Sequence, residues 1–225
     1  MHFAWVKFPQ IRISYSTVME KLEEMLDREV GEYLDKVEGM DEVKALLSGE
    51  ISREDYARFL KTFYIIEYIS RKAVLSAAEH TEETNPYLSA RFITCARGEE
   101  GHAEIALEDL AGLGGGGVDI DAVPVAARYG EVLLDEAERH PLGILGHSYL
   151  FENASGLMFP KHKKPPYPSR FIEVHAKEDP GHSAAIKRTV RKIEPELTDG
   201  QKEEIVRFAR ASGDYLLRVF ESIGG

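Results

Sequence analysis

The sequence predicts an all-α protein, a single multi-helical bundle of about seven helices. Apolar residues recur with a helical period from Ser16 onward, and patterns typical of strands are nearly absent. Helix-capping signals divide this stretch, most clearly at Ser52 and at Asn85-Pro86. Thr198 caps a final helix that extends to about Ile223. With 225 residues, 43% of them hydrophobic, the chain is long enough to bury one substantial core.

The charge balance and the cysteine count restrict the class of partner and the compartment. Asp and Glu number 39 against 28 Lys and Arg, a formal net charge of −11, which argues against a nucleic-acid partner. Cys95 is the only cysteine, so an internal disulfide is excluded and a reducing, cytoplasmic location is expected. No run approaches the roughly 20 apolar residues of a membrane span. Residues 1–16 lack a signal-peptide core and are interpreted as an N-terminal lead-in to one domain, residues 17–225.

Three helices are predicted in the first part of this domain. Thr17 and Glu20 form a capping-box pattern that opens a helix through Val30. A short helix over residues 41–47 follows, and then a long helix over residues 53–79.

The long helix carries one carboxylate, Glu67, on its apolar stripe. Arg71 lies one turn later and offers a routine i,i+4 partner. The sequence therefore leaves two interpretations of Glu67 open, an ordinary ion pair and a ligand that faces the core.

A further helix is predicted over residues 86–113, and its apolar stripe is interrupted at the centre by a Glu-x-x-His pair. Glu99 and His102 lie on the inward stripe, whereas Glu100 points about 100° away. Cys95 lies one turn before Glu99 on the same face. Glu99 and His102 are therefore candidate ligands.

Two more helices are predicted, over residues 123–140 and 142–159. Glu152 lies near the centre of the second one, and Tyr149 lies one turn before it as a candidate hydrogen-bond donor behind the ligands. The loop over residues 159–170 is rich in proline and basic residues. It is interpreted as a solvated connection, with a grip on a substrate carboxylate as the alternative.

The last core helix, residues 171–193, contains the most informative motif. His175, Asp179 and His182 are spaced i, i+4 and i+7, so they lie on one stripe that is otherwise apolar. Burying three such groups costs several kcal/mol unless they are paired. A metal ion is one partner that satisfies all three; a core histidine bonded to Asp179, with the second histidine exposed, is the alternative.

Four helices thus bring carboxylates or imidazoles to the middle of an apolar face. The candidate metal ligands are Glu67, Glu99, His102, Glu152, His175, Asp179 and His182. Carboxylates mixed with imidazoles suit iron or manganese, and the absence of cysteine ligands argues against structural zinc. Seven candidates exceed what one ion needs, so two ions that share carboxylates are expected. The order is close to the ferritin-like di-iron pattern, but Asp179 replaces a Glu and His175 is additional.

The motif His175-x-x-x-Asp179-x-x-His182, with Glu99-x-x-His102 and Glu152 upstream, resembles the haem-oxygenase-like di-iron oxidases. These are related in fold to the TenA thiaminases and to pyrroloquinoline-quinone synthase. The resemblance covers about residues 17–223, and it implies a haem-oxygenase-like bundle with two non-haem irons. It further implies that O2 and a small carboxylate- or amine-bearing substrate react there, with electrons from an external donor. A homodimer is compatible with the sequence.

Two other functions stay open at this point. A TenA-like hydrolase would use Cys95 as its nucleophile, and a ferritin-like iron-binding protein would keep the ligands without a substrate cavity. True haem oxygenase is disfavoured because the first helix offers no axial histidine. Pro180-Gly181 lies inside the ligand motif, so the sequence predicts a kink or a mobile hinge there.

Overall fold

The computed structural model describes residues 20–120 and 123–224, and over these ranges it contains α-helices and short 3-10 turns but no strand. The helices are α1 (Leu22–Val37), α2 (Asp41–Ser48), α3 (Arg53–Thr81), α4 (Pro86–Gly98), α5 (His102–Gly112), α6 (Pro124–Arg139), α7 (Gly143–Met158), α8 (Arg170–Ile193) and α9 (Asp199–Glu221). The all-α prediction is confirmed. The N-terminal lead-in lies outside the described residues and stays a prediction.

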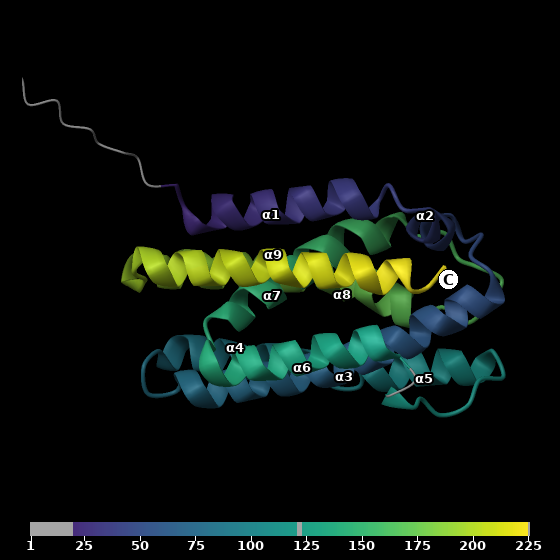
Figure 1. Cartoon of the computed structure of the whole chain (residues 1–225), viewed down its shortest axis with the longest axis horizontal. Coiled ribbons are helices and arrows are strands. Elements are labelled where there is room, and N and C mark those ends of the chain that lie inside the picture. Colours follow the sequence, from purple (N-terminus) through teal and green to yellow (C-terminus); the bar gives the residue numbers. More distant parts are fainter. Residues whose placement is uncertain (1–19, 121–122, 225) are drawn as a thin grey trace, which may run out of the picture.

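The long helices run roughly parallel to one another along the long axis of the molecule (Figure 1). Helices α1 and α9 lie side by side along one edge, and α3, α4, α5 and α6 form the other edge. Between these two groups, α7 packs against α8 and α9, and α8 contacts both α4 and α5. Helices α7 and α8 therefore occupy the middle of the bundle, where a buried site can form.

The capping signals explain where most helices begin. The Ser52 hydroxyl accepts a hydrogen bond from the Asp55 amide, and the Asn85 side chain accepts one from the Leu88 amide. Thr198 forms a capping box with Gln201 at the start of α9. Each cap satisfies an amide that the first helical turn leaves unpaired, which is why these sequence signals located the starts of α3, α4 and α9 correctly.

The predicted start of the first helix is wrong. Helix α1 begins at Leu22, after Glu20, and Thr17 lies outside the described residues. The Leu22 amide donates to the carboxylate of Glu194, which follows α8 and is 172 positions away in the chain. Locally, the Glu24 carboxylate accepts from the Lys21 amide. The start of α1 therefore combines a local cap with a tertiary one, and only the local one can be read from sequence spacing.

The helix predicted over residues 86–113 is also divided. Helix α4 ends at Gly98, α5 begins at His102, and Gly101 between them has a φ of +95°. Residues with a side chain rarely adopt this left-handed backbone conformation, so glycine is the residue that permits the break. The break places Glu99 at the C-terminal end of α4 and His102 in the first turn of α5.

Pro180 does not interrupt α8: the helix is continuous from Arg170 to Ile193, so the sequence is wrong to suggest a break, and the kink or mobility stays a prediction. The close packing of α7 accounts for this continuity. A Cβ atom on Gly156 would lie only 3.2 Å from the carbonyl carbon of Asp179. Just beyond the proline, the Ser183 hydroxyl donates to the side chain of Asn153 on α7. These contacts support the helix at the point where proline removes one helical hydrogen bond.

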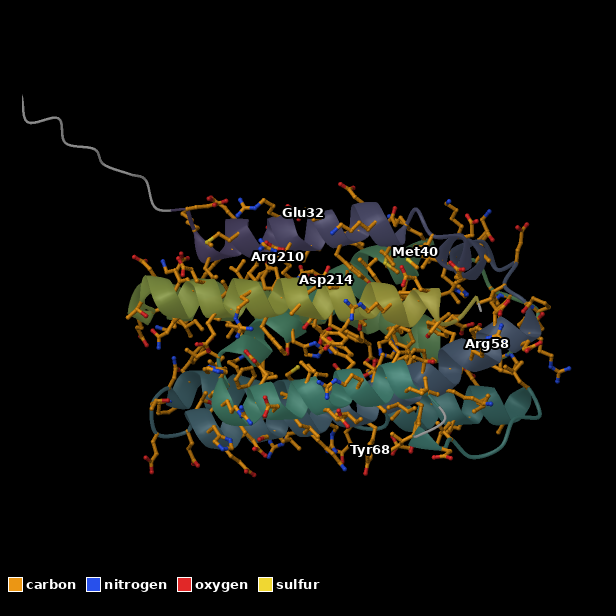
Figure 2. All side chains as sticks on the ribbon, in the orientation of Figure 1. Glu32, Met40, Arg58, Tyr68, Arg210 and Asp214 are labelled. Carbon is orange, nitrogen blue, oxygen red and sulfur yellow. The ribbon has the colours of Figure 1, made fainter. Side chains whose placement is uncertain are left out.

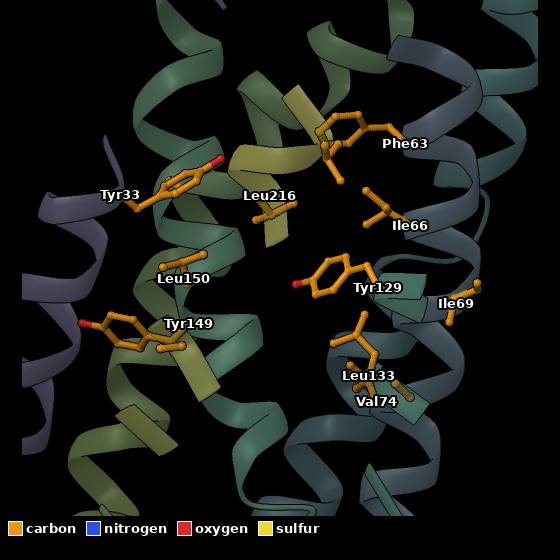
Figure 3. Packing of buried hydrophobic residues seen from close by; sticks show 14 of the residues in the cluster. Tyr33, Phe63, Ile66, Ile69, Val74, Tyr129, Leu133, Tyr149, Leu150 and Leu216 are labelled. Atoms are coloured by element: carbon orange, nitrogen blue, oxygen red, sulfur yellow. The ribbon is translucent and has the colours of Figure 1, made fainter. Parts of the chain in front are cut away.

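The apolar core extends between α3, α6, α7 and α9. Figure 3 shows side chains such as Phe63, Ile66, Tyr129 and Leu216 directed toward one another from these helices. By contrast, Tyr68 on α3 points outward and is 40% exposed (Figure 2). No helix in the described part of the chain has the length and hydropathy needed to cross a bilayer.

Candidate metal centre and adjoining cavity

All seven candidate ligands lie around one position in the middle of the bundle. Glu67 comes from α3, Glu99 and His102 from the break between α4 and α5, Glu152 from α7, and the remaining three from α8. The Glu99 carboxylate connects the set, because one oxygen lies 2.7 Å from Nδ1 of His102 and the other 3.1 Å from Nδ1 of His182. The structure therefore brings together the residues that the sequence pattern selected.

One half of the cluster contains Glu99, His102 and His175, each of which offers a ligand atom within 4.8 Å of the others. The two imidazole rings meet edge to face with centroids 4.7 Å apart. Glu67 closes this group, with its Oε1 3.5 Å from Nε2 of His175. Two imidazoles and two carboxylates thus surround one point.

The other half contains Glu152, Asp179 and His182, whose ligand atoms again lie within 4.8 Å of one another. Nδ1 of His182 lies 3.3 Å from Glu152 and 3.8 Å from Asp179. Glu99 contacts both halves of the cluster, through His102 in one and His182 in the other.

The strongest structural support for a bound ion is a set of buried polar atoms that form no hydrogen bond of regular geometry, although five of the six lie within 3.5 Å of another atom of the cluster. Among the described residues, such atoms in the cluster are Glu67 Oε1, Glu99 Oε1, His102 Nδ1, His175 Nε2, Asp179 Oδ2 and His182 Nδ1. Buried polar side chains are normally hydrogen-bonded, and each orphan costs about 1–3 kcal/mol. A concentration of six orphans on opposing ligand residues fits metal ions, which would satisfy them together.

The orientation of His175 supports the same conclusion. Its Nδ1 lies 2.7 Å from the Phe171 carbonyl oxygen, which can only accept, so Nδ1 carries the proton. When the ring is neutral, the lone pair of Nε2 then points at the cluster. Fixing the tautomer through the other ring nitrogen is the usual arrangement for a metal-binding histidine.

Burial and mutual contacts shift the acid–base properties of the cluster. Burial raises the pKa of Glu152 to about 7 and that of Asp179 to about 6. The carboxylates of Glu152 and Glu99 raise the pKa of His182 to about 11. Burial opposes charge on His175, but the Glu67 carboxylate outweighs it and raises that pKa to about 10. Without a metal the cluster therefore retains protons, which metal binding would displace.

The alternatives left open for Glu67 and His175 are not what the structure shows. The Arg71 guanidinium donates to the Ala96 carbonyl and lies 3.4 Å from Glu100, so it points away from Glu67. His175 bonds the Phe171 carbonyl rather than Asp179.

The expectation that Tyr149 supports the ligands is wrong. Its hydroxyl donates to Asp27 on α1, 2.7 Å away, and Figure 3 shows the ring directed toward α1. Helix α7 is buried on nearly every side, so its faces meet different neighbours. Tyr149 and Glu152 differ by about 60° around the helix, which is enough to send a long side chain to another neighbour.

Sequence reasoning missed Glu178, whose carboxylate lies 3.4 Å from Nε2 of His102. Glu178 is off the apolar stripe of α8 and its side chain is 42% exposed, so the pattern marked it as a solvated residue. The i+3 spacing from His175 was the one available signal. With Glu99 at Nδ1 and Glu178 at Nε2, both ring nitrogens of His102 face carboxylates.

Two spaces adjoin the cluster. A void of about 30 Å³, lined by Glu67, Glu99, Glu152, His175 and Asp179 among others, lies between the ligands and has room for a water or an ion. A larger cavity of about 240 Å³ lies between α4, α7 and α8. Its lining residues are Leu88, Arg91, Phe92, Thr94, Cys95, Gly98, Glu99, Leu145, Ser148, Glu152, His182, Ala185, Ile186 and Thr189. The larger cavity thus reaches the cluster from one side. The basic loop over residues 159–170 contributes none of its lining.

Known structures share this architecture. A TenA homologue from Pyrococcus furiosus superposes with a TM-score of 0.76 at 15% identity, covering 90% of this chain and 99% of that one. A domain of unknown function with a heme oxygenase-like fold from Shewanella denitrificans gives 0.76 at 18% identity, covering 92% and 93%. A TenA homologue from Pseudomonas syringae gives 0.70 at 11% identity, covering 90% and 92%. No protein-family model and no curated protein matches the sequence.

These similarities define a haem-oxygenase-like all-α fold, as the sequence resemblance implied. At these identities they establish the fold alone, and the chemistry has to be argued from the residues of the site.

Proposed function

We propose that this chain is a dinuclear non-haem metalloenzyme, with iron as the expected metal and manganese as the alternative, that uses O2 to oxidise a small molecule. One observation carries the proposal: six orphaned polar atoms on two opposed ligand groups that share Glu99. Imidazole and carboxylate donors of this kind suit iron and manganese. Glu67, Glu99, His102 and His175 would hold one ion, and Glu99, Glu152, Asp179 and His182 the other.

Bound ferrous iron supplies the electrons and the open coordination positions that O2 chemistry requires. The chain itself supplies orientation and exclusion of water. The Phe171 carbonyl fixes the His175 ring, and the Glu178 carboxylate lies behind His102. The larger cavity, walled by residues such as Leu88, Phe92 and Ile186, keeps a substrate in an apolar environment beside Glu152 and His182.

A TenA-like hydrolase with Cys95 as nucleophile is the second candidate, and the names of two of the three described structural neighbours favour it. Cys95 lines the cavity, and its Sγ lies 4.0 Å from Glu152 Oε1. However, burial and the nearby Glu152 and Glu99 carboxylates outweigh the opposing charge of Arg91 and raise the pKa of the thiol well above its usual value. Such surroundings disfavour the reactive thiolate, whereas catalytic cysteines lie in electropositive ones.

A storage protein is the third candidate. It would need the ligands, but it has no use for an apolar cavity that ends at them. The cavity therefore favours an enzyme over an iron store.

The test compares the three functions in one experiment. The protein is loaded anaerobically with two equivalents of ferrous iron and exposed to O2, while visible absorption and O2 uptake are followed. We expect a transient absorption in wild type and in Cys95→Ser, and none in Glu152→Gln. Cleavage of thiamin that proceeds with a chelator present and disappears in Cys95→Ser would instead establish the hydrolase. Iron oxidation without any transient in wild type would favour storage.

A further inference from the structure

The larger cavity has two chemically different ends. Its inner end is formed by Cys95, Glu99, Glu152 and His182, which belong to the candidate metal centre or touch it. Its other end is marked by Arg91, which lines the cavity from α4 about two helical turns before Glu99. The wall between the two ends is largely aliphatic and aromatic. A ligand that fills this cavity therefore meets the cluster at one end and a cation at the other.

Arg91 differs from the other half-buried arginines of the described chain. Arg58 pairs with Glu54 and Asp55, and Arg71 pairs with Glu100. No carboxylate of the described residues lies within ion-pair distance of Arg91, whose one hydrogen bond goes to Thr189. A partly buried charge is costly without a counter-ion, so this position favours an anionic ligand.

The contact with Thr189 orients Arg91. The Thr189 hydroxyl donates to the Ala185 carbonyl at 3.1 Å and therefore accepts from Nε of Arg91 at 3.3 Å. Nε is occupied by this bond, and the terminal nitrogens of the guanidinium stay available. Two parallel donors from one planar group match the two oxygens of a carboxylate.

The spacing along α8 separates this anion site from the metal centre. Thr189 lies seven residues after His182, which corresponds to a rise of about 10 Å along the helix. A carboxylate held by Arg91, while Arg91 stays bonded to Thr189, therefore lies away from His182 along the bundle. A ligand that reaches both Arg91 and the cluster has to be elongated.

We propose that the substrate is an elongated carboxylic acid bound with its carboxylate at Arg91 and its opposite end at the cluster. Arg91 is then the residue that sets specificity and orientation. Oxidation would fall on an atom remote from the carboxylate. A cationic group is disfavoured at the other end by the charge of Arg91. The claim that the opposite end of the ligand reacts at the cluster rests on the proposed function, whereas the claim that its carboxylate binds Arg91 does not.

Binding is tested first, with metal-free protein, by calorimetric titration of 4-(4-bromophenyl)butanoate and its primary amide. We expect the acid to bind wild type at least about tenfold more tightly than the amide, and Arg91→Gln to lose that preference. Arg97→Gln is the matched control, because Arg97 lies on the same helix but is exposed and does not line the cavity. Unchanged melting of Arg91→Gln excludes a folding defect. The proposal would be overturned if the acid did not bind wild type. It would also be overturned if the acid bound Arg91→Gln as tightly as it binds wild type.

Orientation is tested by soaking crystals with the same acid and locating bromine by its anomalous scattering. We expect the bromine beside Cys95 and Glu152 and the carboxylate at Arg91. Bromine beside Arg91, with the carboxylate at the cluster, would overturn the proposed orientation. Neither measurement requires a metal, so a failure here is distinguishable from a failure of the dinuclear centre, which the iron titration detects separately.

Discussion

Two sets of buried carboxylates in this protein are neutralised in different ways. Glu29 on α1 accepts two hydrogen bonds from one edge of the Arg210 guanidinium, from Nε at 3.0 Å and Nη2 at 2.6 Å, and Glu136 on α6 lies 2.9 Å from Arg207. Figure 2 shows Arg210 reaching from α9 toward α1. In the cluster, by contrast, Glu152 faces an imidazole and no Arg or Lys of the described chain lies within ion-pair distance.

The difference separates carboxylates that stabilise the fold from carboxylates that are suited to bind a metal ion. An arginine stays charged at all relevant pH values, so its carboxylate partner is satisfied permanently. An imidazole gives up its proton, after which both partners can hold a metal ion. The predictions below test this difference, from the largest expected effect to the smallest.

The largest effect should come from metal addition. Manganese at about 100 times its dissociation constant stabilises a protein by about 2.7 kcal/mol, or roughly 5–10 °C in melting temperature for a chain of this size. We expect such a shift for wild type and a much smaller one for His182→Ala, measured by differential scanning calorimetry. Equal shifts in the two proteins would remove His182 from the site.

Removing a carboxylate that is paired with arginine should lower the stability of the fold without changing metal binding. Glu29→Ala removes a buried carboxylate whose partner, Arg210, has a side chain that is 62% exposed and can be rehydrated. We therefore expect a loss of about 1–2 kcal/mol in urea unfolding, less than for a fully buried pair. The manganese-induced shift should stay that of wild type. A loss of that shift would show that the two sets are not independent.

The cluster should respond to pH when the protein is kept metal-free with a chelator. The pKa of Glu152 is raised to about 7 by burial, against about 4.5 for an ordinary glutamate. Between these values the folded state holds the extra proton, so the stability that this group contributes falls as pH rises. The free energy of unfolding of wild type relative to Glu152→Gln should therefore fall by about 1–3 kcal/mol from pH 5 to pH 8. A rise over that range would contradict the assigned shift.

The smallest effect is expected for Cys95→Ser. The side chain lines the cavity beside the ligands, but the six orphaned atoms belong to other residues. Manganese affinity should change less than about threefold, which isothermal titration measures directly, because Ser keeps the size of the side chain. Loss of metal binding in this variant would indicate that Cys95 is a metal ligand. A metal that binds thiolates, such as zinc, would then be favoured over iron and manganese.

The sequence predicted the fold and the composition of the cluster because both rest on local patterns. Apolar periodicity and the caps at Ser52, Asn85 and Thr198 located the helices. Polar groups on an apolar stripe identified the candidate ligands, since a helix brings such residues to one face.

What the sequence could not predict depends on contacts between helices. Glu194 caps α1 from a distant part of the chain, and α7 holds Pro180 in a continuous helix. Tyr149 turned toward Asp27 because α7 is surrounded on all sides. Arg91 became notable only when the structure showed it at the end of a cavity with no carboxylate partner. None of these contacts follows from spacing within one helix.

The central claim, that Glu99 joins two metal positions, is tested most directly by counting ferrous ions bound per chain under anaerobic conditions. Glu99→Gln is compared with Glu100→Gln, the adjacent carboxylate, whose side chain is 70% exposed and pairs with Arg71. We predict close to two ions for wild type and for Glu100→Gln, and at most one weakly held ion for Glu99→Gln. Stoichiometry and affinity that are the same in both variants, or no iron bound by wild type, would contradict the dinuclear centre.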